Sequence, residues 1–330
     1  MSFSKWLESQ WYKKTILVYL ITPLSGLYRF VIWLRRLAYS TGIFTTVYLD
    51  CPVIVVGNLT VGGTGKTPLV IWIIECLKNN GWNPGAISRG YGGQSGNNPQ
   101  EVRIASTPTV VGDEPVVISR RTGVDMTVCP DRVRAGQNLL QRSDCNVLVS
   151  DDGLQHYALG RSIEIAVVDA SRQFGNNYCL PAGPLREPLS RLKTVDMVVY
   201  NGGKDNNTHT MKLLGEHAVN LQNSKLIVPL GDFLGRHCHA IAAIGNPKRF
   251  FDLLDAFQLH FDTRVFPDHH KFKLEDFQFT DTAPVLMTEK DAVKCTQFNQ
   301  TNFWYVPVTA YLNPNFSEQL LNLLNKNKNE

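Results

Sequence analysis

The sequence predicts an α/β protein with a mostly parallel sheet flanked by helices, followed by a second, smaller α/β unit. Short uninterrupted runs of valine and isoleucine indicate strands that are buried on both faces, as in parallel sheets. These runs alternate with helical stretches, which is typical of layered α/β folds. The alternation restarts near residue 232, and 330 residues is the length of about two domains.

The predicted elements follow in order along the chain. The first part contains strands at PVIVV (52–56), PGAIS (84–88), MTVC (126–129), NVLVS (146–150), IEIAVVD (163–169) and MVVY (197–200), and helices at 67–80, from about 114, and at 131–142, with Asp131 as an N-cap. The second part contains strands at AIAAIG (240–245), TRVFP (263–267), PVLMT (284–288) and FWYVPV (303–308), with a helix from Pro247 to Phe257. The predicted segments are an N-terminal helical segment (1–43), a core (44–231), a smaller domain (232–314) and a terminal helix (315–330).

The composition, the cysteine spacing and the distribution of charge indicate which kinds of protein this chain can be. The chain is 43% hydrophobic and 19% charged, as in an ordinary globular protein, and its seven scattered cysteines form no C-x-x-C pair, so neither a zinc site nor a disulfide framework is predicted from them. Residues 1–40 carry six basic residues and one acidic residue, whereas the rest of the chain carries 27 basic and 28 acidic residues. This distribution argues against a nucleic-acid partner, which favours a basic face on the domain body.

The positive charge flanks an apolar segment, TILVYLITPLSGLYRFVIWL (15–34), which Arg35 and Arg36 follow. A signal peptide would need a small-residue cleavage site that is missing here. A spanning helix has the right length, but Arg29 and internal proline and glycine interrupt it. A helix packed on the domain is a further alternative. The basic and aromatic flanks favour a helix that lies in the interface of an anionic membrane.

The strongest motif is VIVVGNLTVGGTGKTPLV (53–70), an apolar strand that enters a glycine-rich turn ending in Gly-Lys-Thr. Backbone N–H groups in such a turn, a lysine and a helix N-terminus bind phosphates, and the threonine hydroxyl holds Mg²⁺. Thr60 stands where the usual spacing has a glycine, and this position tolerates a side chain if φ is negative. The motif predicts a nucleoside-triphosphatase (P-loop) type of core that binds a nucleotide with Mg²⁺. The predicted nucleotide-binding residues are Thr60, Val61, Gly62, Gly63, Thr64, Gly65, Lys66 and Thr67.

Two acids, Asp151 and Asp152, follow the strand NVLVS. Nucleoside triphosphatases place the acid that holds Mg²⁺, directly or through water, at the end of a neighbouring strand. Carboxylates also form plain turns before a glycine such as Gly153. Together with the phosphate loop, Asp151, Asp152 and Thr67 are the predicted magnesium-binding residues.

Seven motifs together resemble the tetraacyldisaccharide 4′-kinase family, the lipid A 4′-kinases of Gram-negative bacteria. These motifs are VGNLTVGGTGKTP (56–68), SRGYGG (88–93), VGDEP (111–115), DDGLQH (151–156), GPLREP (183–188), FPDHH (266–270) and MTEKDAVK (287–294). They occur in order over most of the chain. The family's own phosphate loop is similar to this one, so the resemblance explains Thr60.

The resemblance implies an enzymatic activity and a cellular location. It implies ATP-dependent phosphorylation of the 4′-hydroxyl of an acylated glucosamine disaccharide 1-phosphate, giving lipid IVA. It also implies a membrane-associated N-terminal helix at the cytoplasmic face of the inner membrane, whose lipid surface holds the substrate. An enzyme that acts on an acylated sugar must reach the interface, which agrees with the charge distribution of the N-terminal segment.

The resemblance also implies roles for individual residues. Asp113 and His269 correspond to a catalytic acid and its partner histidine, and they act with Lys66; the sequence leaves open which of the pair removes the proton. His270 is the less favoured partner. Arg186 is a candidate phosphate contact and Glu187 a candidate support of the metal shell, although a structural pairing of the two remains an alternative. Further candidates are Arg89 and Tyr91 for the acceptor site, and the 287–294 segment for closing over the nucleotide.

Two rival functions remain open at this level. A membrane-localised partitioning-type regulatory ATPase carries a lysine before the Gly-Gly pair, where this chain has Val61. A GTPase-like metal or cofactor chaperone would need an Asn-Lys-x-Asp motif, which the sequence lacks. Dependence of ATP consumption on an acylated sugar distinguishes the kinase from the regulatory ATPase.

Overall fold

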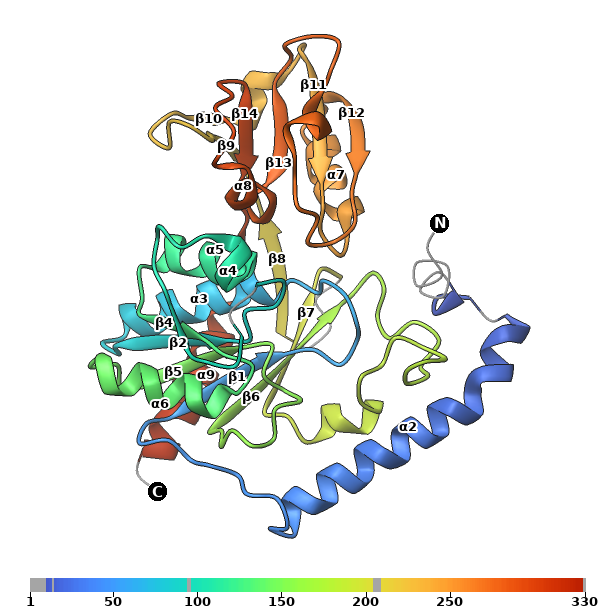
Figure 1. The fold of residues 1–330 in the computed structure, drawn as a ribbon, viewed down its shortest axis with the longest axis vertical. Coiled ribbons are helices and arrows are strands. Elements are labelled where there is room, and N and C mark those ends of the chain that lie inside the picture. Colours follow the sequence, from blue (N-terminus) through green and yellow to red (C-terminus); the bar gives the residue numbers. More distant parts are fainter. Residues whose placement is uncertain (1–9, 14, 94–95, 204–208, 329–330) are drawn as a thin grey trace.

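The computed structural model describes residues 10–13, 15–93, 96–203 and 209–328, and Figure 1 shows them as two domains, one above the other. Within these residues the strands form two sheets, one of nine strands and one of six. The helices are α2 (Ile16–Ser40), α3 (Lys66–Asn79), α4 (Pro108–Val111), α5 (Asp113–Thr122), α6 (Arg132–Arg142), α7 (Pro247–Ala256), α8 (Glu289–Cys295) and α9 (Pro314–Lys328), and short 3₁₀ turns lie at Leu189–Lys193, Leu230–Phe233 and Leu274–Phe277.

The larger sheet forms the core domain, in the order β15-β8-β7-β6-β1-β5-β2-β4-β3. Its strands are β1 (Val53–Gly57), β2 (Pro84–Ser88), β3 (Gln100–Val102), β4 (Met126–Val128), β5 (Val147–Asp151), β6 (Ile163–Asp169), β7 (Met197–Asn201), β8 (His209–Leu214) and β15 (Thr309–Leu312). All neighbours pair in parallel except β3 with β4 and β15 with β8, at the two edges. The predicted parallel sheet is confirmed.

Burial on both faces explains the continuous Val/Ile runs. In β1, Ile54 and Val56 pack under α3, α5 and α9, while Val53 and Val55 pack on the opposite face with α6. All four side chains are at most 2% exposed. β1 therefore lies in the middle of the sheet with a hydrophobic layer on each side, and its carboxyl end is held rigidly.

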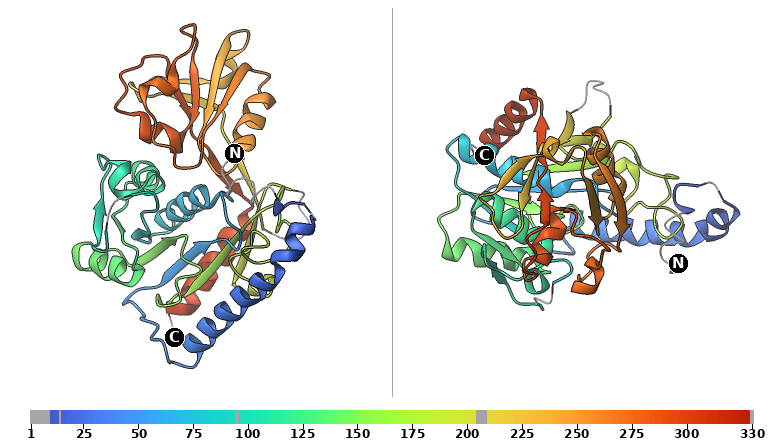
Figure 2. Two further views of the ribbon diagram at one scale, coloured as in Figure 1. Left: turned by 45° about the vertical axis from the view of Figure 1, so that its right-hand side comes forward. Right: turned by 90° about the horizontal axis from the view of Figure 1, so that it is seen from above.

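The smaller sheet forms the second domain, in the order β10-β9-β14-β13-β11-β12. Its strands are β9 (His217–Asn220), β10 (Ile227–Pro229), β11 (His237–Ala242), β12 (His260–Val265), β13 (Val285–Thr288) and β14 (Phe303–Val306). β12, β11, β13 and β14 are parallel, and β14-β9-β10 continue in antiparallel pairing. Helix α7 packs on β11 and β12, while α8 lies between the two domains (Figures 1 and 2).

The sheets divide the chain at different residues from the predicted boundaries at 231/232 and 314/315. β9 and β10 precede residue 232 but belong to the smaller sheet, where β9 pairs with β14 and β10 with β9. β15 precedes residue 315 but pairs with β8 in the core sheet. Helix α9 then packs Phe316 against Trp72 of α3, with ring centroids 5.4 Å apart. The smaller domain is therefore an insertion between β8 and β15.

Helix α2 runs along the outside of the core domain, and Pro23 and Gly26 do not interrupt it. One stripe packs inward: Val18 and Ser25 are each 2% exposed, and Ser25 Oγ donates to the Cys179 carbonyl at 2.8 Å. Among the residues that the structure describes, no helix is both long and apolar enough to cross a membrane. Residues 1–9 and 14 of the predicted 1–43 segment lie outside the described part.

Candidate active site

The phosphate loop follows β1 at the carboxyl edge of the core sheet and leads directly into α3, which begins at Lys66. Gly65 caps the helix in the left-handed region, with φ of 92°. Thr60 forms an isolated antiparallel bridge with Leu185, and Val61 N donates to the Pro184 carbonyl at 2.8 Å. The departure at position 60 is therefore accommodated, because a segment from the 183–188 motif pairs with this end of the loop.

At two positions, one in the loop and one in the smaller domain, neighbouring atoms lie too close for any residue other than glycine. A Cβ on Gly65 would lie 2.1 Å from Nδ2 of Asn201, which donates to the Thr64 carbonyl at 2.8 Å. A Cβ on Gly245, in the smaller domain, would lie 2.5 Å from the Gly63 nitrogen. The loop is thus held from below by β7 and approached from above by the segment after β11.

The side chain of Lys66 lies between an amide and a carboxylate. Its Nζ donates to Asn58 Oδ1 at 3.1 Å and lies 3.4 Å from Asp152 Oδ1. Arg186 reaches the same Asp152 carboxylate, with distances of 3.1 and 3.2 Å from one guanidinium nitrogen to its two oxygens. Burial opposes ionisation of Asp152, but Lys66 and Arg186 outweigh it and hold its pKa below the ordinary value. The two cations and the acid form one charged cluster beside the loop.

Asp151 has a different environment from its neighbour. It ends β5 next to β1, is 1% exposed, and its two carboxylate oxygens accept no hydrogen bond from any residue that the structure describes. Burial and the nearby Glu114 raise the pKa of Asp151 above its ordinary value. The hydroxyl of Thr64 is likewise buried without a partner among these residues. An unsatisfied buried carboxylate beside a phosphate loop fits a divalent cation.

Asp113 and His269 come together from the two domains. Asp113 begins α5 and is 4% exposed; His269 Nδ1 lies 3.1 and 3.0 Å from its two oxygens. Lys290 and Lys294 of α8 lie 4.0 and 3.9 Å from the same carboxylate. Burial favours the neutral acid, but His269 and the two lysines outweigh it, so the pKa of Asp113 is lowered. His270 lies 2.9 Å from Asp276 instead.

The contact between Asp113 and His269 has a consequence for stability. Burial acts to lower the pKa of His269, but its hydrogen bond with Asp113 prevails and the pKa is raised. The contribution of His269 to stability is therefore complete below about pH 6.5, its unfolded value, and is lost as the pH rises through the folded pKa. The contribution of Asp113, whose pKa is lowered, is complete above about pH 4 and is lost as the pH falls through the folded pKa.

We therefore expect the Tm difference between the wild type and His269→Gln to be largest between about pH 4 and 6.5, and to shrink as the pH rises above this window. Thermal unfolding at a series of pH values measures this difference. His217→Gln, on the exposed surface of β9, is the matched control and should follow the wild type at every pH. A difference for His269→Gln that is independent of pH would contradict the ion pair.

Of the remaining candidate site residues, Tyr91 and Arg89 are exposed, whereas Glu187 is buried. Tyr91 is 60% exposed and packs edge-on against His269, with ring centroids 4.9 Å apart, so it lies beside the pair; Arg89 is exposed nearby in the same loop. Glu187 is buried: Oε1 accepts from Gln155 at 2.9 Å and Oε2 accepts from Tyr157. Both carboxylate oxygens of Glu187 are thus engaged by neighbouring side chains, and its support of a metal shell stays a prediction.

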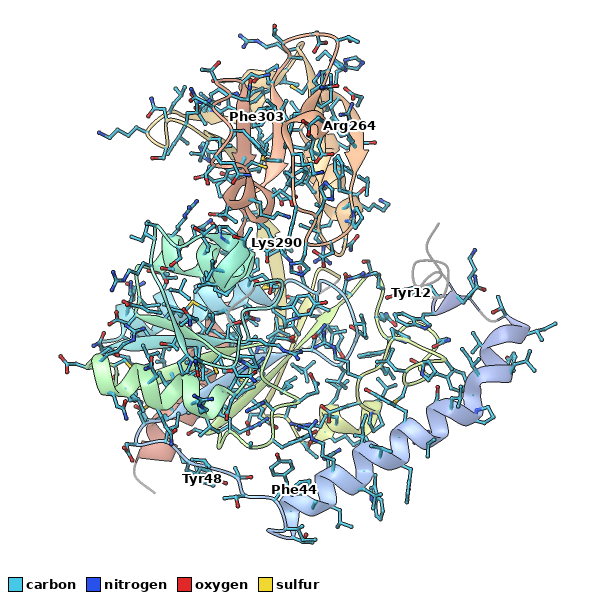
Figure 3. The ribbon with its side chains drawn as sticks, viewed as in Figure 1. Tyr12, Phe44, Tyr48, Arg264, Lys290 and Phe303 are labelled. Carbon is cyan, nitrogen blue, oxygen red and sulfur yellow. The ribbon has the colours of Figure 1, made fainter. Side chains whose placement is uncertain are left out.

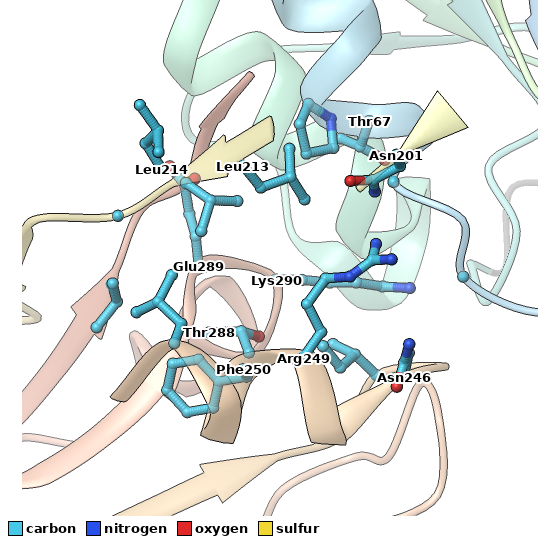
Figure 4. Close-up of a pocket in the computed structure, with 18 of the residues that line it drawn as sticks. Thr67, Asn201, Leu213, Leu214, Asn246, Arg249, Phe250, Thr288, Glu289 and Lys290 are labelled. Carbon is cyan, nitrogen blue, oxygen red and sulfur yellow. The ribbon is translucent and has the colours of Figure 1, made fainter. Parts of the chain in front are cut away.

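A cavity of about 640 Å³ separates the loop from the smaller domain (Figure 4). It is lined by residues 63–68 on one side and by residues of α7 and α8 on the other. Figure 3 shows Lys290 at the level where the domains meet. Its Nζ lies 3.0 Å from Glu114, 3.3 Å from Asp268 and 3.5 Å from His269 Nε2. The 287–294 segment therefore faces the loop across the cleft.

A buried acid that the sequence analysis did not select connects the two sides of the cleft. Asp169, at the end of β6, is 1% exposed and binds Arg172 at 3.0 Å and Arg249 of α7 at 3.0 Å. Arg172 donates to the carbonyls of Gly63 and Gly245. Asp169 ends an apolar strand beside β1, as Asp151 does, so the same sequence pattern, an acid at the end of such a strand, could have identified it. No such pattern identifies Arg172 or Arg249.

The comparisons with known proteins agree with each other. The family model described as tetraacyldisaccharide-1-P 4′-kinase matches residues 17–325. Tetraacyldisaccharide 4′-kinase of Nitrosococcus oceani is 52% identical over 322 residues, covering 98% of this chain and 95% of the relative; that of Methylobacillus flagellatus is 48% identical, covering 97% and 96%. A crystal structure of LpxK from Aquifex aeolicus in complex with ATP has a TM-score of 0.78 and 26% identity, covering 94% of this chain and 100% of the other.

Proposed function

The chain belongs to the tetraacyldisaccharide-1-P 4′-kinase family and is an ATP-dependent kinase of lipid A biosynthesis, and we propose which residues of its cleft bind the phosphates, accept the proton and hold Mg²⁺. The reaction transfers the γ-phosphoryl group of ATP to the 4′-hydroxyl of a tetraacylated disaccharide 1-phosphate. The 4′-oxygen forms a bond to the γ-phosphorus, the bond from that phosphorus to the bridging oxygen breaks, and ADP leaves with the electron pair.

The loop at 60–67 holds the triphosphate of ATP. Residues 63–65 of the loop and the first residues of α3 line the cavity between the domains, which supports this role. Lys66 neutralises charge that develops on the phosphoryl oxygens, and to reach them it exchanges its contacts with Asn58 and Asp152 for the nucleotide. Arg186 remains on Asp152 and balances its charge.

Asp113 and His269 accept the proton of the 4′-hydroxyl. The buried carboxylate, whose lowered pKa keeps it ionised at neutral pH, is the proposed base, and His269 orients it and shares the proton. Tyr91, on the exposed side of His269, and Arg89 in the same loop are the proposed contacts to the sugar. The single observation that carries this proposal is the 3.0 Å contact between two motifs 156 residues apart, next to Glu114 and Lys290, which line the cavity together with the phosphate loop.

The residues that would hold Mg²⁺ are Thr67 and Asp151, with Asp152 through water. The unsatisfied oxygens of Asp151 support this set, and Mg²⁺ prefers one or two carboxylates together with phosphate oxygens. When bound, Mg²⁺ withdraws charge from the phosphate oxygens and helps to orient them. The protein supplies the buried carboxylate of Asp151, which the end of β5 fixes at the carboxyl edge of the sheet.

Incubation of the protein with ATP and a tetraacylated disaccharide 1-phosphate, followed by mass spectrometry, tests the activity. We expect one added phosphate on the disaccharide and one ADP for each product. ATP consumption that proceeds equally well without the acylated sugar would support a regulatory ATPase of the partitioning type instead.

Helix α2 is the proposed attachment to the cytoplasmic leaflet of the inner membrane. Its outward face exposes apolar and aromatic side chains: Ile16, Tyr19, Leu20, Leu24, Leu27, Phe30, Val31, Trp33, Leu34 and Leu37. Phe44 and Tyr48 continue this surface beyond the helix (Figure 3). Exposed Arg29 and Arg35 suit anionic headgroups. Tyr28 on the inward face donates to the Arg186 carbonyl at 3.1 Å, so the same helix contacts the segment beside the phosphate loop.

Replacing Leu20, Leu24 and Leu27 with glutamine is expected to weaken binding to anionic vesicles by about 100-fold, because each half-inserted leucine contributes on the order of 1 kcal/mol. Flotation with vesicles and ATP-binding measurements on the same samples give the two readouts. The matched control replaces Ile227 and Val265, which are 55% and 56% exposed on the smaller domain, and should float like the wild type. Unchanged flotation of the triple variant would exclude α2 as the attachment.

A further inference from the structure

Histidines and aspartates gather on one face of the smaller domain, at the end of β11 and β12 that is distant from the cleft (Figure 1). His237 and His239 are two residues apart on β11 and so point to the same face of the sheet. In the parallel register His239 lies opposite Asp262, and His237 lies opposite His260. The proposed catalytic chemistry uses none of these side chains.

The ligand atoms of three of these residues converge. Asp262 Oδ1 lies 2.6 Å from His239 Nδ1 and 3.1 Å from His237 Nε2, and the donor atoms of the three residues all lie within 4.8 Å of one another. Ligands bound to Zn²⁺ at 2.0–2.1 Å in a tetrahedron lie about 3.3 Å apart. The two distances from Asp262 Oδ1 are shorter than this, and Asp262, whose side chain is 50% exposed, has room to move.

The most buried of these residues, His239, is held in one orientation. Its side chain is 7% exposed, its ring stacks on Phe279 with centroids 3.7 Å apart and an interplanar angle of 10°, and its Nε2 lies 2.7 Å from Asp281 Oδ1. A carboxylate on one ring nitrogen leaves the lone pair of the other for a cation, which is the usual support of a metal-bound histidine. Because a neutral imidazole has only one N–H, the second short contact, to Asp262, needs either a second proton on the ring or a cation between the two groups.

From this geometry we propose that His237, His239 and Asp262 form a binding site for a divalent late transition metal such as Zn²⁺, with Asp281 as the orienting partner of His239. Two imidazoles and one carboxylate are the donor set of open zinc sites, in which water takes the fourth position. Mg²⁺ and Ca²⁺ prefer sites made of oxygen alone. His237, with a side chain 37% exposed, leaves the site accessible from solvent.

The residue between the two histidines is not part of the site. Cys238 points to the opposite face of β11, where it is fully buried in the hydrophobic core of the domain, and burial raises the pKa of its thiol to about 11. The ligand set therefore contains no thiolate. A bound metal would join β11 to β12, the edge strand of the smaller sheet, and so stabilise the domain that forms one side of the cleft.

Titration of the metal-stripped full-length protein with ZnCl₂, in buffer with excess MgCl₂, tests the proposal by calorimetry and by thermal unfolding. We expect one equivalent of Zn²⁺ to bind and to raise the Tm. His237→Gln should abolish this binding, and Asp281→Asn should weaken it about 10- to 100-fold. Asp262→Asn, at an exposed position, is a second ligand variant in case the first one folds poorly.

Two controls localise the zinc. His217→Gln, on β9 of the same sheet, and Asp151→Asn, at the phosphate loop, should both keep the full equivalent. The proposal is overturned if the wild type binds no Zn²⁺, which would leave a proton on His239 between its two aspartates. It is also overturned if His237→Gln and Asp262→Asn bind Zn²⁺ as tightly as the wild type, or if Asp151→Asn alone removes the binding.

Discussion

Replacement of Lys66 with alanine is expected to reduce kcat/KM by about 10³-fold or more, which abolishes measurable turnover. The ammonium group belongs to the first residue of α3, which lines the cavity together with residues 63–65 of the loop. Its removal takes away the charge that balances the transferred phosphoryl group, and it also leaves Asp152 with Arg186 as its remaining ion-pair partner among the described residues. The repulsion between Asp152 and the triphosphate should then weaken ATP binding as well.

Steady-state kinetics with the acylated disaccharide, together with ATP binding, measure this effect. Lys78→Ala is the matched control, because it removes the same side chain from the last turn of the same helix, far from the loop. Its kinetics should stay close to those of the wild type. Near-normal activity of Lys66→Ala would remove the nucleotide site from this loop.

Replacement of Asp113 or His269 with alanine is expected to lower kcat by about 10²–10⁴-fold while ATP affinity stays nearly unchanged. The two side chains contact each other at 3.0 Å, and Asp113 begins α5 rather than the phosphate loop. If they act as a unit, the double variant should be about as slow as the slower single variant, because either change already disables the proton acceptor. Multiplicative losses in the double variant would mean that they act separately.

The neighbouring histidine supplies the control for this pair. His270 follows His269 directly but contacts Asp276 at 2.9 Å, inside the smaller domain. His270→Ala should therefore keep the wild-type kcat, although it costs some stability. A loss of kcat in His270→Ala as large as that in His269→Ala would show that the loop as a whole, rather than the contact with Asp113, is needed.

The sequence predicts those features of the molecule that are determined by residues close together in the chain. Strands β2 (84–88) and β6 (163–169) have the predicted bounds, and in β6 the isoleucine and valine side chains are buried, as their continuous run indicates. The phosphate loop is predicted by its glycines and Lys66, and Asp131 caps α6 by accepting from two backbone N–H groups, as expected. The contact of Asp113 with His269 was predicted only through resemblance, since nothing local joins residues from two domains.

Features that depend on chain pairing were missed for the same reason. β9 and β15 are four-residue strands with no strong pattern, and their partners are decided by the path of the chain between the sheets. The arginines that bind Asp169 come from a loop and from the other domain, so no spacing marks them. The cluster around His239 needs the register of β11 on β12, and a shift of one residue would point Asp262 to the other face.

The return of β15 and α9 to the core sheet has a consequence for how the protein is made. Phe316, Leu320 and Leu324 are completely buried against the core of the nucleotide-binding domain, yet they follow the whole inserted domain in the chain. The inserted domain, whose strands lie between residues 217 and 306, emerges complete while the apolar side of α3 still lacks its cover. During translation the core domain, although it begins first, can therefore be completed only after the inserted domain has been synthesised.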